Sequence, residues 1–355
     1  MERYEHGGNV YAHPGCVDFS ANLNPLGMPV AAREALRAGV SLFEAYPDPA
    51  CAELTASIAA FERVPADWVV PCAGATDAFA RICQSLRPRK ALVCAPCYSG
   101  YEQALEQVGA HVAYHDLNSD DDFAVTSDLV RDLVPGVDLL FVANPNNPTG
   151  RCVGADVLMA CLEHAQKIGA TVVLDECFID LVSHVGSGQG ASLGQQTSSN
   201  ALLSRYPNLV LVKALTKSYC LAGLRVGYVL CANPQLVARL QAAGQPWAVS
   251  TPAQLAGVAC LADKDFLPKS RSLIARERER LADALRDCGL CVVPGEANYL
   301  LFYGPCGLAD ALLAHNILIR TCDNYRGLSA RWYRIAVRTP QQNDRLIAAL
   351  QEVAQ

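Results

Sequence analysis

The sequence lacks any segment expected to enter or cross a membrane. No uncharged apolar run approaches the ~18 residues that span a bilayer. The N-terminal stretch Met1–Asn9 is polar and has no apolar core of the kind found in a secretion signal. We therefore expect a cytoplasmic protein with no membrane partner.

An excess of basic charge is also absent. Lys and Arg number 29 against 35 Asp and Glu, which gives a net charge of −6, and no basic cluster stands out. A nucleic-acid partner is therefore not expected, because binding to a phosphate backbone depends on a positive patch. The 355 residues are 51% hydrophobic and 18% charged, which is enough for a large core and two domains.

Disulfide bonds are not expected, although the chain has sixteen cysteines. A chain of this length without a secretion signal does not need a disulfide framework, and most of the cysteines lie in apolar surroundings, where a thiol acts as a small hydrophobic group. Cys94 and Cys97 have the spacing of redox and zinc sites, and a zinc site would need two further ligands beside them. We expect no metal, and a redox or metal-binding module on these two residues is the non-enzymatic alternative.

Short apolar runs alternate with amphipathic runs over most of the chain. This alternation predicts an α/β fold with a large domain, whose mostly parallel sheet is flanked by helices, and a smaller α+β C-terminal domain. We expect an N-terminal arm (residues 1–40) packing on the small domain, the large domain at 41–248 and the small domain at 249–355. A long helical stretch, Pro252–Asp287, is expected to open the small domain, and a strand at Ile317–Thr321 to lie within it.

The stretch Lys213–Tyr228 carries the strongest chemical signal. Lys217 lies just beyond a predicted strand, Thr216 precedes it, and Arg225 follows eight positions later. A lysine amine forms a Schiff base with an aldehyde, and hydroxyl and guanidinium groups hold a phosphate. Pyridoxal phosphate has both groups, so the spacing indicates this cofactor. The alternative for the stretch alone is a solvated basic turn.

The turn after an earlier predicted strand suits the cofactor's phosphate. Gly74 and Ala75 let the backbone approach a ligand, and Thr76 opens the following helix, whose free amides bind anions. An ordinary helix cap is the alternative. After the next strand, Tyr98 could stack on the pyridine ring, although Tyr98 and Tyr101 are each also explained as packing residues.

Asp175 ends a predicted buried strand, where a carboxylate can pair with the pyridine nitrogen and keep it protonated. A strand-end cap is the alternative. The heptapeptide Asn144–Gly150 follows another strand and is rich in turn-forming residues.

These motifs, in this order, resemble the fold-type-I, aspartate-aminotransferase-like family of pyridoxal phosphate enzymes. In that family the asparagine before Pro-Thr-Gly, here Asn147, bonds the cofactor's phenolic oxygen. The resemblance also assigns Tyr46 to the phosphate of the neighbouring subunit's cofactor, which implies a homodimer with shared active sites. One departure is Ala214, where the family usually has Ser or Thr on the cofactor phosphate. Lys213, beside it, is a charge with no expected role.

One branch of this family is most similar to the chain, namely the threonine-phosphate decarboxylases of cobalamin biosynthesis, relatives of the histidinol-phosphate aminotransferases. The segments that carry the likeness include Asp18–Gly27, Asp175–Asp180, Ile319–Leu328 and Tyr333–Arg345. Phe178 is typical of the decarboxylase branch, whereas the aminotransferases usually have tyrosine there.

The resemblance gives Arg334 the substrate α-carboxylate, which an arginine can bind bidentately. Arg320, His6 and Arg338 are the candidates for a substrate phosphate, and a surface charge is the alternative for each. The expected reaction is decarboxylation of L-threonine O-3-phosphate to (R)-1-amino-2-propanol O-2-phosphate. A histidinol-phosphate-type aminotransferase and a serine-phosphate decarboxylase stay open, because the bond that breaks depends on substrate orientation and one methyl group contributes only ~1–3 kcal/mol to discrimination.

Overall fold

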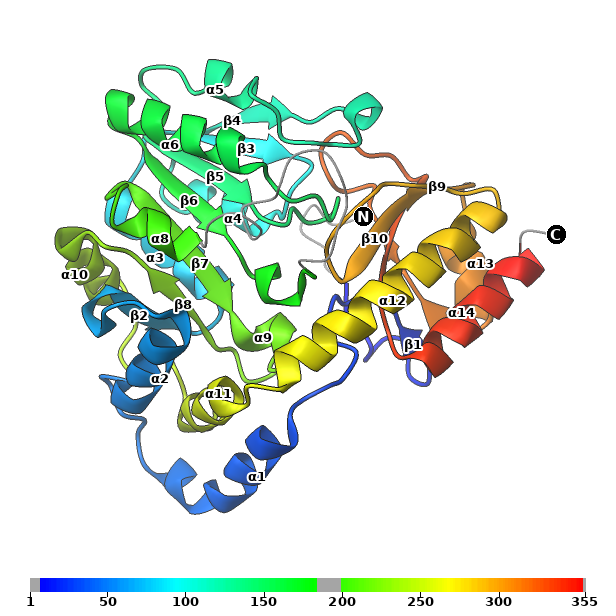
Figure 1. Cartoon of the computed structure of the whole chain (residues 1–355), viewed down its shortest axis with the longest axis horizontal. Helices are drawn as coiled ribbons and strands as arrows, with labels where there is room; N and C mark the ends of the chain where they lie inside the picture. Colours follow the sequence, from blue (N-terminus) through cyan, green and yellow to red (C-terminus); the bar gives the residue numbers. More distant parts are fainter. Residues whose placement is uncertain (1–6, 184–198, 354–355) are drawn as a thin grey trace.

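The computed structural model describes residues 7–183 and 199–353, which form a larger α/β part and a smaller part beside it (Figure 1). The larger part is built on a seven-stranded sheet in the order β2-β8-β7-β6-β5-β3-β4. β8 runs opposite to the other six strands, which are parallel to one another, and this confirms the predicted mostly parallel sheet. The strands are β2 (Val69–Cys72), β3 (Lys90–Ala95), β4 (His111–Asp116), β5 (Leu139–Ala143), β6 (Thr171–Asp175), β7 (Leu209–Ala214) and β8 (Gly227–Leu230).

Helices cover both faces of this sheet, so its central strands are apolar on both sides. In β7, Leu209 and Leu211 pack into the core on one face, and Val210 and Val212 pack into the core on the other. The first face is covered by α2 (Ala52–Glu62), α5 (Leu129–Asp132), α6 (Ala155–Ile168), α8 (Ser199–Leu203) and α11 (Thr251–Ala262). The second is covered by α3 (Ala75–Leu86), α4 (Gly100–Glu106) and α10 (Pro234–Ala242).

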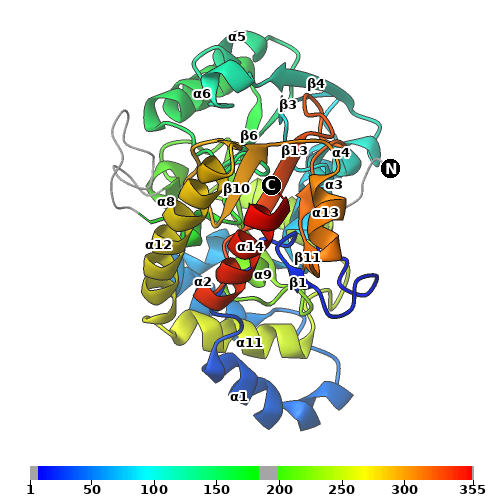
Figure 2. The same ribbon diagram turned by 90° about the vertical axis from the view of Figure 1, so that its right-hand side faces the viewer.

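The smaller part has its own antiparallel sheet, in the order β12-β13-β10-β9, and its own core. Its elements are α12 (Phe266–Asp287), β9 (Cys291–Val292), β10 (Tyr299–Tyr303), α13 (Leu308–Ala314), β11 (Ile317–Leu318), β12 (Arg320–Thr321), β13 (Trp332–Ala336) and α14 (Pro340–Val353). Figure 2 shows α12 and α14 side by side on the outer face of this sheet. Although α12 is 22 residues long, it is rich in charge, and within the two described ranges no helix is long and apolar enough to cross a membrane.

The N-terminal arm joins both parts. β1 (Val17–Asp18) pairs with β11, and Phe19 packs in the core of the smaller part. Farther along, α1 (Val30–Ala38) lies against α11, where a Cβ on Gly39 would lie 2.4 Å from Leu255. The domain boundaries stay predictions. α11 begins beyond residue 248, the predicted end of the large domain, and packs in the core of the larger part.

Two predicted elements differ from the structure. The helical stretch Pro252–Asp287 is two helices, since the Asp263 carboxylate accepts the amides of Asp265 (3.1 Å) and Phe266 (3.2 Å) and so ends one helix and starts the next. The strand Ile317–Thr321 divides into β11 and β12, which pair in different sheets.

Candidate active site

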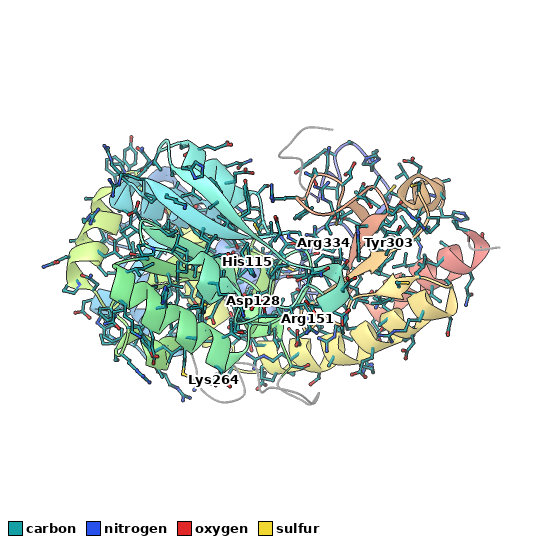
Figure 3. All side chains as sticks on the ribbon, turned by 90° about the horizontal axis from the view of Figure 1, so that it is seen from above. His115, Asp128, Arg151, Lys264, Tyr303 and Arg334 are labelled. Atoms are coloured by element: carbon teal, nitrogen blue, oxygen red, sulfur yellow. The ribbon has the colours of Figure 1, made fainter. Side chains whose placement is uncertain are left out.

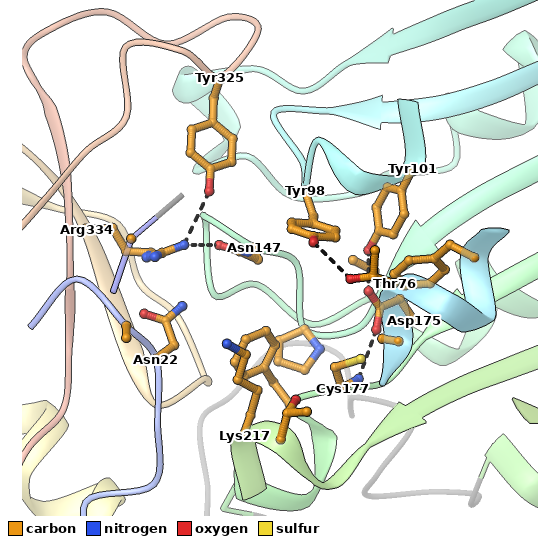
Figure 4. A pocket seen from close by; sticks show the side chains of 18 of the residues that line it. Asn22, Thr76, Tyr98, Tyr101, Asn147, Asp175, Cys177, Lys217, Tyr325 and Arg334 are labelled. Atoms are coloured by element: carbon orange, nitrogen blue, oxygen red, sulfur yellow. Dashed lines mark hydrogen bonds between the residues drawn. The ribbon is translucent and has the colours of Figure 1, made fainter. Parts of the chain in front are cut away.

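The carboxyl ends of the parallel strands meet at one edge of the large sheet, and a cavity of about 420 Å³ lies there (Figure 4). The N-terminal arm and the smaller part form its other wall. Nine residues predicted from the sequence as site residues line it: Ala75, Thr76, Tyr98, Asn147, Asp175, Thr216, Lys217, Arg225 and Arg334.

Lys217 follows β7 in the short helix α9 (Leu215–Ser218), and its side chain points into the cavity (Figure 4). The N-terminal arm fixes this turn, because Asn24 donates its backbone N–H to the Lys217 carbonyl (3.1 Å) and its side-chain amide to the Ser218 carbonyl (2.7 Å). Burial, together with the charges of Arg334 and Arg225, lowers the pKa of Lys217. A lower pKa increases the share of neutral amine, which is the form that attacks an aldehyde.

Asp175 is the last residue of β6 and is buried. Its carboxylate accepts hydrogen bonds from the Tyr101 hydroxyl (2.5 Å) and the Cys177 amide (3.0 Å). Burial raises the pKa of Asp175, and the hydrogen bonds from Cys177 and Tyr101 oppose that rise. The result is a fixed carboxylate whose charge a protonated ring nitrogen would stabilise.

The part of the cavity between the start of α3 and Arg225, which we call the phosphate corner, is suited to bind an anion. Gly74 has a φ of +82°, and a Cβ there would lie 2.9 Å from Nη2 of Arg225. A Cβ on Gly227 would lie 3.2 Å from the Ala75 nitrogen, so both glycines keep the start of α3 open beside the guanidinium. Thr76 stands in this first turn, and its hydroxyl lies 3.4 Å from that of Tyr98. Free amides at a helix start and an adjacent arginine together suit a phosphate.

Arg334, in β13, enters the cavity from the smaller part and lies at the junction of the two parts when the molecule is seen from above (Figure 3). It is buried and donates to the Asn147 side-chain oxygen, to the Ser20 carbonyl (2.7 Å) and to the Tyr325 hydroxyl (3.3 Å). Figure 4 shows Arg334 on one side of the cavity and Asp175 on the other. A carboxylate could therefore be held at the end of the cavity opposite Asp175.

Four predicted residues that the structure describes, Gly74, Tyr46, Arg320 and Arg338, do not line this cavity. Gly74 is next to Arg225, a lining residue, whose Nη2 would lie 2.9 Å from a Cβ on Gly74. Arg320 donates to Asn324 (2.7 Å), and its guanidinium lies 5.9 Å from the ring centre of Tyr325, which does line the cavity. Arg338 lies just past β13, Tyr46 is 78% exposed, and His6 falls outside the described residues.

Several lining residues were missed by reading the sequence. Ser20 and Asn22 come from the N-terminal arm, and Tyr325 from the loop before β13. The prediction that Tyr101 is only a packing residue was incomplete, because its ring stacks on Phe141 (4.9 Å) while its hydroxyl bonds Asp175. Ser20, Asn22 and Tyr325 lie in segments that carry the likeness to the decarboxylase branch, Asp18–Gly27 and Ile319–Leu328, but none of these three residues was singled out.

The structure explains Lys213. Its amine lies 2.9 Å from a Glu62 oxygen and 3.7 Å from a Glu176 oxygen, and all three residues are buried. Tyr228 and Asn200 also donate to Glu62. Burial by itself would lower the pKa of Lys213, but the neighbouring carboxylates raise it above its usual value. Lys213 is thus the cation of a buried ionic cluster beside the strand ends that carry Asp175 and Lys217.

Cys94 and Cys97, the candidates for a redox or metal site, have the character of unreactive thiols. All sixteen are free thiols, and burial raises the pKa of Cys94 to about 12 and that of Cys97 well above its usual value. In the described parts of the chain, no three His, Cys, Asp or Glu side chains gather as metal ligands.

The chain is similar to known enzymes over nearly its whole length. The family of class I and II aminotransferases matches residues 14–350. A threonine-phosphate decarboxylase of Salmonella typhimurium is 34% identical, over 98% of this chain and 96% of that protein. A histidinol-phosphate aminotransferase of Ralstonia nicotianae is 35% identical, over 94% and 88%. The crystal structure of the histidinol-phosphate aminotransferase from Clostridium acetobutylicum superposes with a TM-score of 0.85 at 27% identity, covering 95% of this chain and 98% of that one.

The predicted cofactor agrees with this family, whose enzymes depend on pyridoxal phosphate. The cavity fits the group, because it presents an amine of lowered pKa, a buried carboxylate and a corner kept open by two glycines next to Arg225. The chain belongs to the class I and II aminotransferase family of pyridoxal phosphate enzymes.

Proposed function

We propose that this enzyme decarboxylates L-threonine O-3-phosphate to (R)-1-amino-2-propanol O-2-phosphate, a step of cobalamin biosynthesis. One observation carries the choice of reaction: the cavity wall holds Phe178, without a hydroxyl, at the position where the related aminotransferases usually have tyrosine. Its ring packs against that of Tyr299, with 5.0 Å between the centres. The similarity to a threonine-phosphate decarboxylase along 98% of the chain supports the same choice.

Pyridoxal phosphate, when bound, supplies an aldehyde for the substrate amine and a ring that accepts the electron pair of a bond broken at the α-carbon. Thr76, Arg225, Thr216 and the start of α3 would hold its phosphate, and Asp175 its ring nitrogen. Tyr98 would lie against the ring.

The protein's own part in the reaction is orientation and proton handling. Arg334 grips the substrate carboxylate and, with Asn147 beside it, sets which bond of the α-carbon breaks. After CO₂ leaves, the α-carbon needs one proton, and Lys217 is the cavity amine placed to deliver it. No net oxidation occurs, so decarboxylation requires no second substrate.

The substrate phosphate is assigned to Arg320, with His6 and Arg338 as further candidates. Arg320 is buried and approaches the cavity through Tyr325. Exposed surface cations would not offer the desolvated contact that makes an arginine–phosphate pair strong.

A histidinol-phosphate-type aminotransferase is the second candidate, favoured by the 35% identity to the Ralstonia enzyme. It would use nearly the same residues, with Lys217 removing a proton from the α-carbon in place of delivering one. The two reactions differ in their need for a keto acid.

The test is incubation of the enzyme with L-threonine O-3-phosphate, with the loss of CO₂ and the amino alcohol phosphate measured. We expect turnover without any keto acid, and a lower kcat/KM for L-serine O-phosphate. Turnover only in the presence of 2-oxoglutarate or glutamate would establish the aminotransferase instead. Lys217→Ala, in parallel, controls for contaminating activity.

We also propose that the enzyme is a homodimer in which Tyr46 completes the partner's phosphate site. Tyr46 is exposed and its ring packs at a tilt against Trp247 (4.7 Å between ring centres), and Val40, Leu42 and Phe43 are exposed nearby in the chain. An exposed apolar group of this kind is typical of a subunit interface. Mixing the variants Tyr46→Ala and Lys217→Ala tests it, since exchanged dimers should recover about a quarter of wild-type activity if sites are shared. If subunit exchange is verified and activity does not return, the active sites are not shared between subunits.

A further inference from the structure

One ion pair crosses from the smaller part to the edge of the large sheet beside the cavity. Nε of Arg326 lies 2.6 Å from Oδ1 of Asp116, and Nη2 lies 2.8 Å from Oδ2, although 210 residues separate the two in sequence. Asp116 is the last residue of β4, and Arg326 belongs to the loop between β12 and β13. In Figure 2 this loop, coloured orange-red, reaches over to β3 and α4.

The pair has the geometry that makes surface ion pairs effective. Both side chains are about half exposed, a setting in which single-point contacts contribute little. Here the contact is bidentate, and the guanidinium also lies 4.4 Å from the ring centre of Tyr114, whose hydroxyl donates to Glu102. The hydrogen bond from Arg326 lowers the pKa of Asp116, so the carboxylate stays ionised at neutral pH.

What the pair holds in place is Tyr325, the next residue along the loop. Tyr325 lines the cavity, and its hydroxyl accepts from Arg334 at 3.3 Å. Asn324, one residue earlier, accepts from Arg320. A second hollow, of about 340 Å³, shares Tyr98 and Tyr325 with the cavity and is bordered by Glu102, Tyr114 and Arg326. The loop therefore stands where the cavity opens toward this hollow.

We propose that Asp116 and Arg326 are positioning residues, which clasp the loop 322–328 to the large sheet and so hold Tyr325 and Arg334 in the geometry that receives the substrate carboxylate. Neither residue lines the cavity, so they act through Tyr325. Opening the clasp would let substrate and product pass, and closing it would complete the carboxylate site. The identity of that substrate rests on the proposed function, but the clasp itself does not.

Two readouts separate the clasp from the proposed function. The first is hydrogen–deuterium exchange of residues 322–328 in the cofactor-loaded enzyme, which needs no substrate. We expect Asp116→Asn and Arg326→Gln each to speed exchange in this loop about five- to tenfold, with the rest of the sheet unchanged. The matched control is Glu163→Gln, which removes the exposed partner of Arg205 at 3.0 Å, far from the loop, and should leave exchange in 322–328 unaltered.

The second readout is kinetic. With L-threonine O-3-phosphate, the two variants should raise KM about five- to tenfold while kcat changes less than about twofold, because the substrate carboxylate, once bound, itself holds Arg334 in place. The charge exchange Asp116→Arg/Arg326→Asp should recover at least part of both effects. Unchanged loop exchange in Asp116→Asn, or a charge exchange no better than the single variants, would overturn the clasp. If threonine phosphate is not turned over, the proposed function fails while the exchange measurement still decides the clasp.

Discussion

The hydroxyl of Tyr101 lies 2.5 Å from Oδ2 of Asp175 and donates a hydrogen bond to it, across 74 residues of sequence. Tyr101 belongs to α4 and Asp175 ends β6, so the bond ties a covering helix to the strand end that faces the cofactor ring. The chemistry of this carboxylate thus depends on a residue that the sequence predicts only as packing.

Tyr101→Phe is expected to shift cofactor binding along the pH scale. Burial already raises the pKa of Asp175, and losing an opposing hydrogen bond raises it further. The carboxylate then becomes protonated at a higher pH, so the acid limb of pyridoxal phosphate affinity should move to higher pH. Affinity measured by absorbance between pH 4 and 8 checks this. Tyr206→Phe, which removes a hydroxyl bonded to Glu163 (3.2 Å), is the control. If the acid limb of cofactor affinity lies at the same pH in both variants, the prediction is contradicted.

Lys217→Ala is expected to abolish the absorbance of the bound cofactor near the visible edge, because no other lysine lines the cavity among the described residues. Turnover should fall by several orders of magnitude, as expected when a covalently acting amine is lost. Lys167→Ala, at an exposed position in α6, should retain the wild-type spectrum. An unchanged spectrum in Lys217→Ala would show that Lys217 does not form the Schiff base with the cofactor.

Gly74→Ala is expected to weaken cofactor binding at least about tenfold, because the new Cβ would displace the Arg225 guanidinium from the phosphate corner. The substitution also strains the backbone, which costs on the order of 1–2 kcal/mol of stability. Gly169→Ala separates the two effects, since Gly169 has a φ of +77° and no atom within 4 Å of its would-be Cβ. It should lose stability and keep cofactor affinity. Equal affinities for the two variants would count against the phosphate corner.

Lys213→Met is expected to destabilise the protein by about 3–5 kcal/mol at neutral pH, because Glu62 and Glu176 would remain buried without their cation. Urea unfolding at about pH 7.5 measures the loss. Lys167→Met, at the exposed position, should be nearly neutral, and Glu62→Gln combined with Lys213→Met should recover part of the stability. A loss below about 1 kcal/mol would contradict the importance of the cluster.

The same variant has a defined pH dependence. In the wild type, burial alone would raise the pKa of Glu62, but Lys213 and the hydrogen-bond donors hold it below its usual value. The stabilisation of the fold by ionised Glu62 is therefore fully present above the pKa of Glu62 in the unfolded chain. It is lost only as the pH falls through the lower pKa that Glu62 has in the folded protein. In Lys213→Met, only the hydrogen-bond donors still oppose burial, so the folded pKa values of both carboxylates rise, and this variant gains stability as the pH falls toward about 5. The difference in the free energy of unfolding between this variant and the wild type should therefore be smaller at that pH. A constant difference would show that the charges of Glu62 and Glu176 do not cause the loss of stability.

The sequence by itself determined the elements and the points where chemistry could lie. Hydrophobic periodicity marks the strands and helices, because a buried strand must be apolar on both faces. Lys217, Asp175 and Asn147 could be assigned to one edge of the sheet, since each follows a strand and parallel strands end on the same side.

Only the tertiary structure decided which distant side chains join these residues in the active site. Arg334 meets Asn147 across 187 residues and Ser20 across 314, Asn24 fixes the turn of Lys217, and Asp116 holds Arg326. Each contact joins two of three separate pieces: the smaller part, the N-terminal arm and the larger part. Periodic patterns encode which face of an element is buried, but not which distant side chain it meets, because that pairing depends on how two separately built cores dock.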